Sequence, residues 1–259
     1  MAGSAGRELA PQRWDRLRQI VRARRVARVA ELCRKLRASP ATIRRDLEAL
    51  EKLGQIRRVH GGAVSVESAL EEPLFDDKTS IAAREKHRIA LAALELVGQG
   101  ETVFLDGGST VLEFARLLRE RGDVTVVTNS LRAVIELAAS GPRVILAGGE
   151  LRRLSQTAVG PLTGALLESL HIDRAFMGTM GLTLAEGLTT TDPAEAHTKR
   201  LVMGRSREVV LLADGGKVGK VLFASAGRIE DIHVLVTDRG AEAAFVREIR
   251  KRGVRVIAA

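Results

Sequence analysis

Apolar residues recur with two different periods along the chain, and the change of period divides it into two regions. Up to about residue 63 the apolar positions lie three and four residues apart, which predicts amphipathic helices. From about residue 102 onwards, short unbroken runs of valine, isoleucine and leucine alternate with amphipathic segments. Such runs predict strands of a mostly parallel sheet that is covered by helices on both faces.

The first region predicts three helices and a β-hairpin, about the size of one winged module. The expected elements are helices at 11–24, 30–36 and 40–53, a short strand at 26–29 and a hairpin at 55–63. The strand is expected to pair with the hairpin. Residues 1–10 are expected to form a disordered tail.

The third expected helix carries the clearest local signals. Ser39 can cap its N-terminus with the side-chain hydroxyl, and Pro40 fits the first helical position, where a missing N–H costs nothing. Gly54 is a natural C-cap. One face of the helix is expected to be apolar and to consist of Ile43, Leu47, Leu50 and Leu53.

The other face of this helix is basic, which is typical of a helix that enters the major groove of DNA. Arginine forks match guanine O6 and N7, and threonine can contact a thymine methyl or a phosphate. The following hairpin is also basic and has the pattern of a wing. The candidate DNA contacts are Ser39, Thr42, Arg44, Arg45, Arg57, Arg58 and His60. The alternative interpretation is a solvated amphipathic helix followed by a turn.

Charge is distributed unevenly between the two regions. Residues 1–62 hold 16 Lys and Arg and 6 Asp and Glu, a net charge of +10, whereas the remaining residues have a net charge of −1. This asymmetry predicts a polyanionic partner for the first region alone, with strongly salt-dependent binding. One tryptophan and no tyrosine argue against a single-strand or RNA-loop binder that stacks bases on aromatic side chains.

Other composition signals exclude several classes of site. The single cysteine, Cys33, rules out an intrachain disulfide and a cysteine-built metal site. Four of the histidines lack metal-ligand spacing and are interpreted as structural or surface residues: His87, His171, His197 and His233. His197 follows the 189–192 loop closely in the sequence, so a contact with a ligand is an alternative for that residue. No cofactor is expected. No apolar run reaches membrane-spanning length and the N-terminus lacks a signal peptide, so a soluble cytoplasmic protein is expected.

The second region predicts a doubly wound α/β domain. The expected strands are 102–106, 124–128, 143–147, 174–178, 208–213, 234–238 and 254–258. The expected helices are 85–97, 111–120, 131–139, 162–170, 194–203 and 241–252. Between the two regions, residues 64–84 are polar and predict a linker, which is expected to pack in part on the second domain through Leu74 and Phe75.

Small and polar residues follow several of these strands, at the edge where ligands bind in open α/β sheets. Glycines allow close approach to the backbone, and hydroxyls and N–H groups can hold an anion. A phosphorylated small molecule is therefore the expected ligand. The candidate contacts are Asp106, Gly107, Gly108, Ser109, Thr110, Thr128, Asn129, Ser130, Gly148, Gly149, Asp214 and Lys217. The alternative is ordinary turns between strands and helices, which need the same residue types.

Two sets of motifs resemble one protein family. T-I-R-R-D-L, then L-G, then I-R-R-V-H-G-G-A are similar to the winged helix-turn-helix of the DeoR family of bacterial transcriptional regulators. E-K-x-x-I-A at 85–90, L-D-G-G-S-T, V-T-N-S, the Gly148–Gly149 turn, G-L-T-T at 187–190 and D-G-G-K resemble the DeoR-type sensor domain. The resemblance covers nearly the whole chain from residue 11. One departure is D-G-G-K, where a serine-rich D-S-S-K is expected.

The resemblance implies a fold and a function. It implies a winged helix-turn-helix at 11–63 and an effector-sensing and oligomerising α/β domain at 85–259, similar in fold to ribose-5-phosphate isomerase and the coenzyme A transferases. It implies a dimeric or tetrameric repressor of carbohydrate-metabolism genes that binds operator DNA and responds to a phosphorylated sugar. The candidate contacts above would then line the effector pocket.

Two alternatives remain open at this point. The kinship with isomerases would allow a sugar-phosphate isomerase or transferase with an accessory DNA-binding domain. The sequence places neither a Glu nor an Asp–Lys pair for proton abstraction, which weighs against an enzyme. A sensor domain whose pocket binds nothing is the other possibility.

Overall fold

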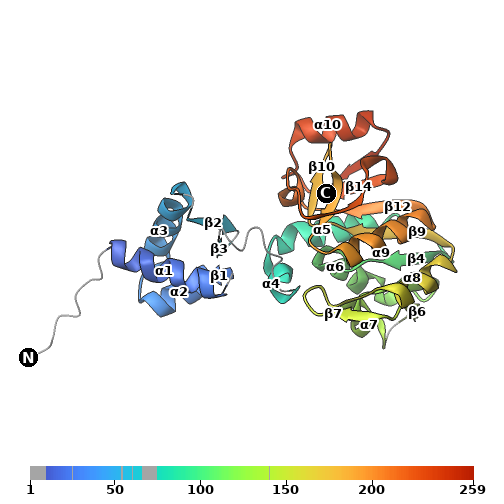
Figure 1. The fold of residues 1–259 in the computed structure, drawn as a ribbon, viewed down its shortest axis with the longest axis horizontal. Coiled ribbons are helices and arrows are strands. Elements are labelled where there is room, and N and C mark those ends of the chain that lie inside the picture. The colour runs from blue at the N-terminus through green and yellow to red at the C-terminus, as the bar shows by residue number, and fades with distance from the viewer. Residues whose placement is uncertain (1–9, 25, 54, 60, 66–74, 140) are drawn as a thin grey trace, which may run out of the picture. The chain divides into compact units, whose positions relative to one another are not determined.

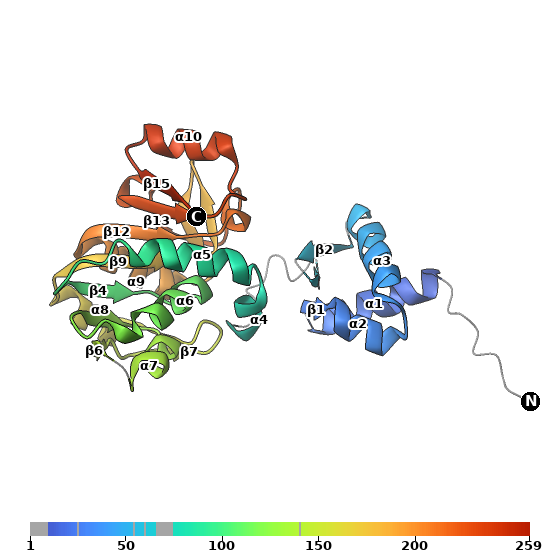
Figure 2. The same ribbon diagram turned by 180° about the vertical axis from the view of Figure 1, so that it is seen from behind.

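The computed structural model describes residues 10–24, 26–53, 55–59, 61–65, 75–139 and 141–259 (Figures 1 and 2). The chain divides into two compact units, Met1–Asp77 and Lys78–Ala259. Residues 1–9 of the expected tail lie outside the described residues, and residue 10 already belongs to the first helix.

The first unit has the predicted order of helices followed by a hairpin. Its elements are α1 (Ala10–Arg24), β1 (Val26–Arg28), α2 (Val29–Leu36), α3 (Pro40–Lys52), β2 (Ile56–Val59) and β3 (Gly62–Ser65). The strands form an antiparallel sheet in the order β1-β3-β2. The predicted pairing of the short strand with the hairpin is therefore confirmed.

Apolar side chains of the three helices and the sheet form one core in this unit. Its fully buried members include Leu17, Leu32, Ile43, Leu47 and Leu50. The sheet closes tightly over this core, because a Cβ atom at Gly62 would lie 2.2 Å from the Ala27 carbonyl oxygen. Only glycine fits where β3 passes β1.

The prediction that Leu53 extends the apolar face of α3 is wrong. The helix ends at Lys52, and Leu53 is its C-cap with 57% of its surface exposed. Because the chain leaves the helix there, the Leu53 side chain leaves the buried stripe. The expected C-cap, Gly54, lies outside the described residues.

The predicted linker at 64–84 contains a helix that the sequence analysis did not assign. After β3 ends at Ser65, residues 66–74, including Leu74, lie outside the described residues. The chain then forms α4 (Phe75–Ser80), and Phe75 is 2% exposed. The limits of the linker stay a prediction.

The second unit contains the predicted parallel sheet. Its strands are β4 (Thr102–Leu105), β5 (Thr125–Thr128), β6 (Arg143–Leu146), β9 (Ile172–Gly178), β12 (Ser206–Leu212), β14 (Val234–Thr237) and β15 (Arg255–Ala258). They pair in parallel in the order β15-β14-β12-β9-β4-β5-β6.

Helices cover both faces of this sheet, as predicted (Figure 1). One core contains residues of α5 (Ala83–Leu94), α6 (Ser109–Leu117) and α7 (Leu131–Leu137). The other core contains residues of α8 (Pro161–Glu168), α9 (Pro193–Gly204) and α10 (Ala243–Lys251). Side chains alternate between the two cores along each strand, so Val103 and Leu105 belong to one and Phe104 to the other. The helices end within a few residues of the predicted limits.

The sequence analysis missed several short elements of this unit. They are the antiparallel hairpin of β7 (Glu150–Arg152) and β8 (Thr157–Val159), the antiparallel sheet β10 (Gly181–Thr183), β11 (Gly187–Thr190) and β13 (Ala224–Gly227), and the 3-10 helices η2 (Leu118–Glu120), η3 (Gly215–Lys217) and η4 (Ile229–Asp231). These strands have three or four residues and are rich in Gly, Ala and Thr. They are too short to show a period, and pairing with another short strand fixes each of them.

Candidate functional site

Helix α3 presents basic side chains from its first two turns. The Thr42 backbone N–H donates to Ser39 Oγ at 3.2 Å, and the two hydroxyls lie 2.9 Å apart. Arg44 and Arg45 are exposed, while Ile43 between Thr42 and Arg44 is buried. The predicted N-cap and outward basic face are confirmed. That Arg44 and Arg45 contact base edges stays a prediction.

A buried carboxylate fixes this helix to α1. Asp46 is 5% exposed, and its oxygens accept from Arg13 Nε at 2.5 Å, Arg13 Nη2 at 3.0 Å and Trp14 Nε1 at 2.8 Å. Such charge-assisted bonds are short and directional, so they set the orientation of α3 on α1. The sequence analysis missed this clamp of Asp46 with Arg13 and Trp14, because both partners lie more than 30 positions from Asp46 in the sequence. A signal did exist, since Asp46 follows Ile43 by three residues and therefore falls on the apolar stripe.

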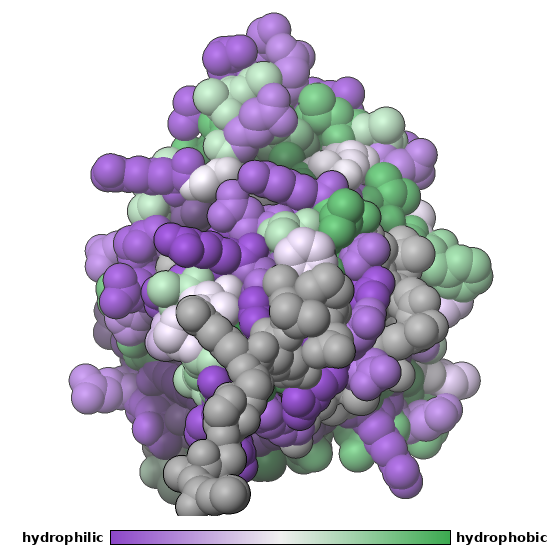
Figure 3. All heavy atoms as spheres, turned by 90° about the vertical axis from the view of Figure 1, so that its left-hand side faces the viewer, coloured by the Kyte–Doolittle hydropathy of each residue, from purple (hydrophilic) through white to green (hydrophobic). Residues whose placement is uncertain are grey.

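The hairpin β2–β3 forms the predicted wing. The Arg58 backbone N–H donates to Glu51 Oε1 at 2.9 Å, and the exposed Arg58 guanidinium lies 3.9 Å from Glu51 Oε2, which links the wing to α3. Arg57 belongs to β2, and His60 lies outside the described residues. The face of the molecule drawn in Figure 3 carries many hydrophilic side chains with smaller apolar areas between them.

In the second unit, the carboxyl ends of the parallel strands bring the predicted effector contacts to one edge of the sheet. Across the strand order, Asp214 follows β12, Gly178 ends β9, Asp106 follows β4, Thr128 ends β5 and Gly148 comes shortly after β6. This is the edge where α/β sheets bind ligands. Whether these residues hold an effector stays a prediction.

A buried ion pair occupies the middle of this edge. Lys199 Nζ contacts Asp106 Oδ2 and donates to the Gly178 carbonyl at 2.9 Å, and the Gly178 N–H donates to Asp106 Oδ2 at 2.9 Å. Asp106 is 5% exposed and Lys199 6%. The sequence analysis did not place this pair. Its two residues lie 93 positions apart in the sequence, so no local pattern connects them.

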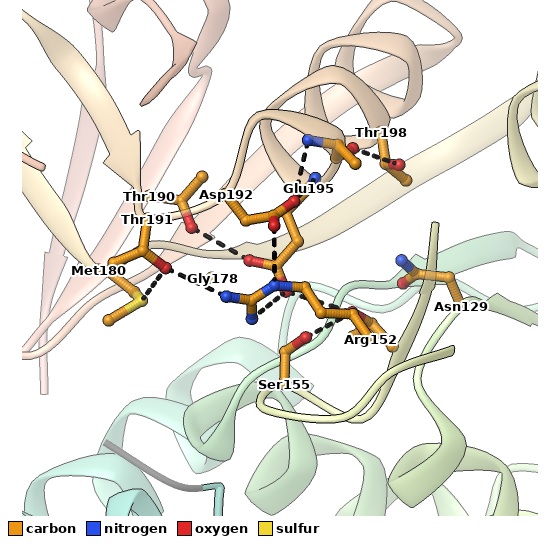
Figure 4. A network of polar contacts seen from close by, with 12 residues as sticks. Asn129, Arg152, Ser155, Gly178, Met180, Thr190, Thr191, Asp192, Glu195 and Thr198 are labelled. Carbon is orange, nitrogen blue, oxygen red and sulfur yellow. Dashed lines mark hydrogen bonds and ion pairs between the residues drawn. The ribbon is translucent and has the colours of Figure 1, made fainter. Parts of the chain in front are cut away.

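A second polar network joins the N-terminus of α9 to the hairpin β7–β8 and to β11 (Figure 4). Glu195 accepts from the Thr157 hydroxyl at 3.2 Å and from the Thr190 hydroxyl at 3.1 Å. The Arg152 guanidinium bridges Glu195 at 3.3 Å and Asp192 at 3.1 Å. None of these residues was predicted as a site residue. The sequence signals were the quoted G-L-T-T motif, which contains Thr190, and the 189–192 loop, which also contains Asp192.

The predicted contacts after β5 already hold structural partners. The Thr128 hydroxyl donates to the Leu105 carbonyl at 2.6 Å and accepts from the Ser130 N–H at 3.0 Å, and Ser130 caps α7. Asn129 Nδ2 donates to the Ala158 carbonyl at 3.0 Å. Asn129 Oδ1 is buried and has no hydrogen-bond partner within the described part of the chain. Asn129 therefore has the least satisfied polar atom of the three.

The remaining predicted contacts lie in two glycine turns and the first residues of α6. Gly107 and Gly108 lead into Ser109 and Thr110, which are buried at the start of that helix. In the turn after β6, Gly148 is exposed and its carbonyl accepts from the Thr163 hydroxyl at 2.8 Å, while Gly149 lies beside it.

Lys86 on α5 adds a cation that the site prediction did not include. It is 3% exposed, and its Nζ donates to the carbonyls of Lys78 at 2.5 Å and Ile81 at 2.6 Å. Burial is the main cause that lowers the pKa of Lys86 to about 8, and the ammonium of Lys217 lowers it further, while the Asp214 carboxylate raises it. The charges of Asp214 and Lys217 therefore both act on Lys86.

The structure accounts for the glycine at the first position of the D-G-G-K departure. Asp214 Oδ1 accepts from the Gly216 N–H at 3.0 Å and caps η3, and the Gly215 N–H donates to Asp238 Oδ1 at 2.6 Å. A Cβ atom at Gly215 would lie 2.4 Å from the backbone carbon of Gly240. The close approach of that loop leaves no room for a serine.

Two further observations concern metals and membranes. Among the described residues, no group of three or more His, Cys, Asp and Glu could hold a metal ion. His197, which was weighed as a ligand contact, is exposed on α9. Across the same residues, none of the helices has the length and apolar character needed to cross a membrane.

Both units match known family models. Residues 13–69 match the DeoR-like helix-turn-helix domain, and residues 81–239 match the DeoR C terminal sensor domain. The chain is 40% identical over 219 residues to the HTH-type transcriptional regulator GlpR of Haloferax volcanii, covering 85% of this chain and 86% of that protein. It is 38% identical over 229 residues to the HTH-type transcriptional regulator GolR of Listeria innocua, covering 88% and 90%.

A third relative is the lactose phosphotransferase system repressor of Streptococcus mutans, at 35% identity over 231 residues, covering 88% of this chain and 91% of that protein. Among solved structures, ribose 5-phosphate isomerase A from Methanocaldococcus jannaschii matches with a TM-score of 0.40 at 20% identity, covering 53% of this chain and 55% of that one.

Proposed function

The chain belongs to the DeoR family of transcriptional regulators, and on this premise we propose that it represses a carbohydrate-metabolism operon under the control of a phosphorylated sugar. The first unit binds operator DNA in the cytoplasm. The second unit binds the effector, and effector binding changes the affinity for DNA. By linkage, DNA changes the affinity for the effector by the same factor.

The exposed Arg44 and Arg45 on the capped helix α3 are the single observation that carries the DNA-binding part. A bidentate arginine–guanine pair contributes about 1–3 kcal/mol of discrimination. Arg44→Ala and Arg45→Ala are each expected to weaken operator binding in a gel shift by that amount. The control is Lys52→Ala at the other end of the helix, where the side chain is 76% exposed and pairs with Glu48. Equal operator affinities for all three variants would contradict the role of the two arginines.

The effector part is supported by the position of the predicted contacts at the carboxyl edge of the sheet. A thermal unfolding screen with a panel of phosphorylated sugars tests it, because a ligand that binds only the folded state raises the melting temperature. Repeating the screen with operator DNA measures the coupling. A panel without any shift would favour a sensor unit that no longer binds a metabolite.

We also infer a homo-oligomer, a dimer or a tetramer held together by the second unit. A helix-turn-helix protein binds repeated half-sites when it is symmetric, and two recognition helices multiply the specificity of one. Sedimentation of the full chain tests this, and a monomer at micromolar concentration would contradict it.

An enzyme is the less favoured function. The relatives are named as transcriptional regulators and repressors. The Asp106–Lys199 pair is buried and both side chains also bond to the Gly178 backbone, which favours a structural role for the pair. Turnover of ribose 5-phosphate by the purified chain would reverse this conclusion.

A further inference from the structure

Arg37, in the turn between α2 and α3, has a backbone conformation that its residue type does not favour. It is the C-cap of α2, with φ at 49° and ψ at 40°, in the left-handed region that residues with a Cβ atom avoid. The conformation closes the helix, because the N–H groups of Arg37 and Ala38 both donate to the Cys33 carbonyl. Glycine is the usual residue at such a helix end, since it adopts this conformation without strain.

The fold of the first unit does not use the Arg37 side chain. Arg37 is exposed, and it makes no hydrogen bond or ion pair within the part of the chain that the structure describes. Two other non-glycine residues of the described ranges have a positive φ, and the fold accounts for both. Gln156 accepts from Arg132 Nε at 2.5 Å, and Ala82 carries only a methyl group. A strained residue whose long side chain has no role in its own fold points to a function outside it.

The charge around this turn is of one sign. Residues 32–45 contain five arginines and lysines and no aspartate or glutamate. Lys35 in the last turn of α2 pairs with Glu31 at 3.7 Å, whereas the exposed Arg34 has no polar partner among the described residues. The end of α2 thus presents two unpaired guanidinium groups, Arg34 and Arg37, which an anion would stabilise.

The dipole of α2 is a weaker explanation for Arg37. Cations near the C-terminus of a helix do interact favourably with its dipole. The eight-residue helix already has Arg34 and Lys35 in its last turn, however. A glycine at position 37 would close the same helix without strain, so the dipole gives no reason for an arginine there.

The turn lies next to the helix that is proposed to enter the major groove. Arg37 precedes Ser39, the N-cap of α3, by two residues, so the two Cα atoms lie within about 7 Å of each other. When the first turns of α3 lie in the groove, the segment that leads into this helix comes close to the adjoining sugar–phosphate backbone. An arginine fork matches phosphate oxygens with two parallel hydrogen bonds.

We propose that the Arg37 guanidinium binds a phosphate of the DNA backbone beside the groove that α3 enters. Arg34 adds to the same positive surface. The contact positions the protein on the duplex and reads no sequence. The conformational cost of an arginine in this turn is thus offset when DNA is bound. This inference rests on the proposed DNA binding and adds to it a contact outside α3 and the wing.

Salt titrations of the full chain with the substitution Arg37→Gly test the contact. The probes are a mixed-sequence DNA duplex and a duplex that the unaltered chain selects from a random-sequence pool. The variant is expected to bind both about tenfold more weakly at low salt, as for losing a hydrogen bond to a charged group. The slope of log affinity against log salt concentration should become shallower by about 0.9 for each copy of the chain bound. A loss on the selected duplex alone would overturn the phosphate assignment, because Arg37 would then read a base.

Lys35→Ala is the matched control. It removes the same charge from the same end of α2, where the Lys35 side chain is 41% exposed and pairs with Glu31. The control is expected to leave the salt slope unchanged. Equal effects of the two substitutions would mean that only the net charge of the unit matters, and they would overturn a specific contact of Arg37.

Thermal unfolding followed by Trp14 fluorescence separates the DNA contact from a role in folding. Arg37→Gly removes the left-handed strain, so its melting temperature should equal that of the unaltered chain or exceed it by a few degrees. A lower melting temperature would mean that the guanidinium supports the end of α2, and this result would overturn the proposal.

The outcomes distinguish this inference from the proposed function. If the unaltered chain binds duplex DNA and Arg37→Gly binds it equally well with the same salt slope, only the role of Arg37 is overturned. If the unaltered chain has no salt-sensitive affinity for the mixed-sequence duplex and selects none from the pool, the proposed DNA binding falls and the contact falls with it.

Discussion

Replacing Asp46 with asparagine is expected to destabilise the first unit by about 3 kcal/mol. The Asp46 carboxylate accepts three hydrogen bonds, two from the Arg13 guanidinium and one from the Trp14 indole. An asparagine amide has one oxygen, so its NH2 group must face one of these donors. The substitution therefore leaves a donor of this site unsatisfied and removes the Asp46 counter-charge from the guanidinium.

The magnitude follows from burial. Removing one partner of a buried ion pair costs about 3–5 kcal/mol. The lower end applies here, because the Arg13 side chain is 14% exposed and can recover some hydration. A unit of 77 residues has a total stability of roughly 4–12 kcal/mol, so the loss is a large fraction of it.

Trp14 makes the measurement selective. It is the only tryptophan of the chain, so its fluorescence in urea follows the first unit alone. Asp15→Asn is the matched control, since the Asp15 side chain is 58% exposed in an ion pair with Arg18, and a change within about 0.5 kcal/mol is expected. Equal unfolding midpoints for the two variants would refute the claim that the buried clamp holds α3 on α1.

Further predictions concern the second unit. Burial keeps the pKa of Lys86 at about 8, below its ordinary 10.5, so the unfolded state binds more protons between these values. The free energy of unfolding should therefore rise by up to about 3 kcal/mol from pH 8 to pH 10.5, and urea titrations should show this slope disappear in Lys86→Met. Gly215→Ser should lower the calorimetric melting temperature by several degrees, because its Cβ would lie 2.4 Å from the Gly240 backbone; an unchanged value would contradict the tight approach. Glu195→Gln should lose about 2 kcal/mol through the weakened Arg152 pair, as calorimetry can measure, whereas a neutral result would make the network dispensable.

Local signals in the sequence were enough for most elements. The Ser39–Pro40 start of α3 needs only a hydroxyl, an N–H three residues on and a fixed φ, and all of these lie within one turn. The parallel strands were predicted because burial on both faces requires unbroken apolar runs. Leu53 was wrongly assigned to the buried face because the spacing of apolar residues in the sequence continues past Lys52, where the helix ends.

The sequence by itself determined the basic module, the winged order of its elements and the alternating strands and helices of the second unit, since each depends on neighbours along the chain. Only the tertiary structure decided which polar groups meet. Asp106 pairs with Lys199, 93 positions away in the sequence, and Asp46 pairs with Arg13, 33 positions away. The residues next to either carboxylate in the sequence do not predict which cation it pairs with. Such pairs form because burial forces a charged group to find a counter-charge, and the fold alone fixes which one is within reach.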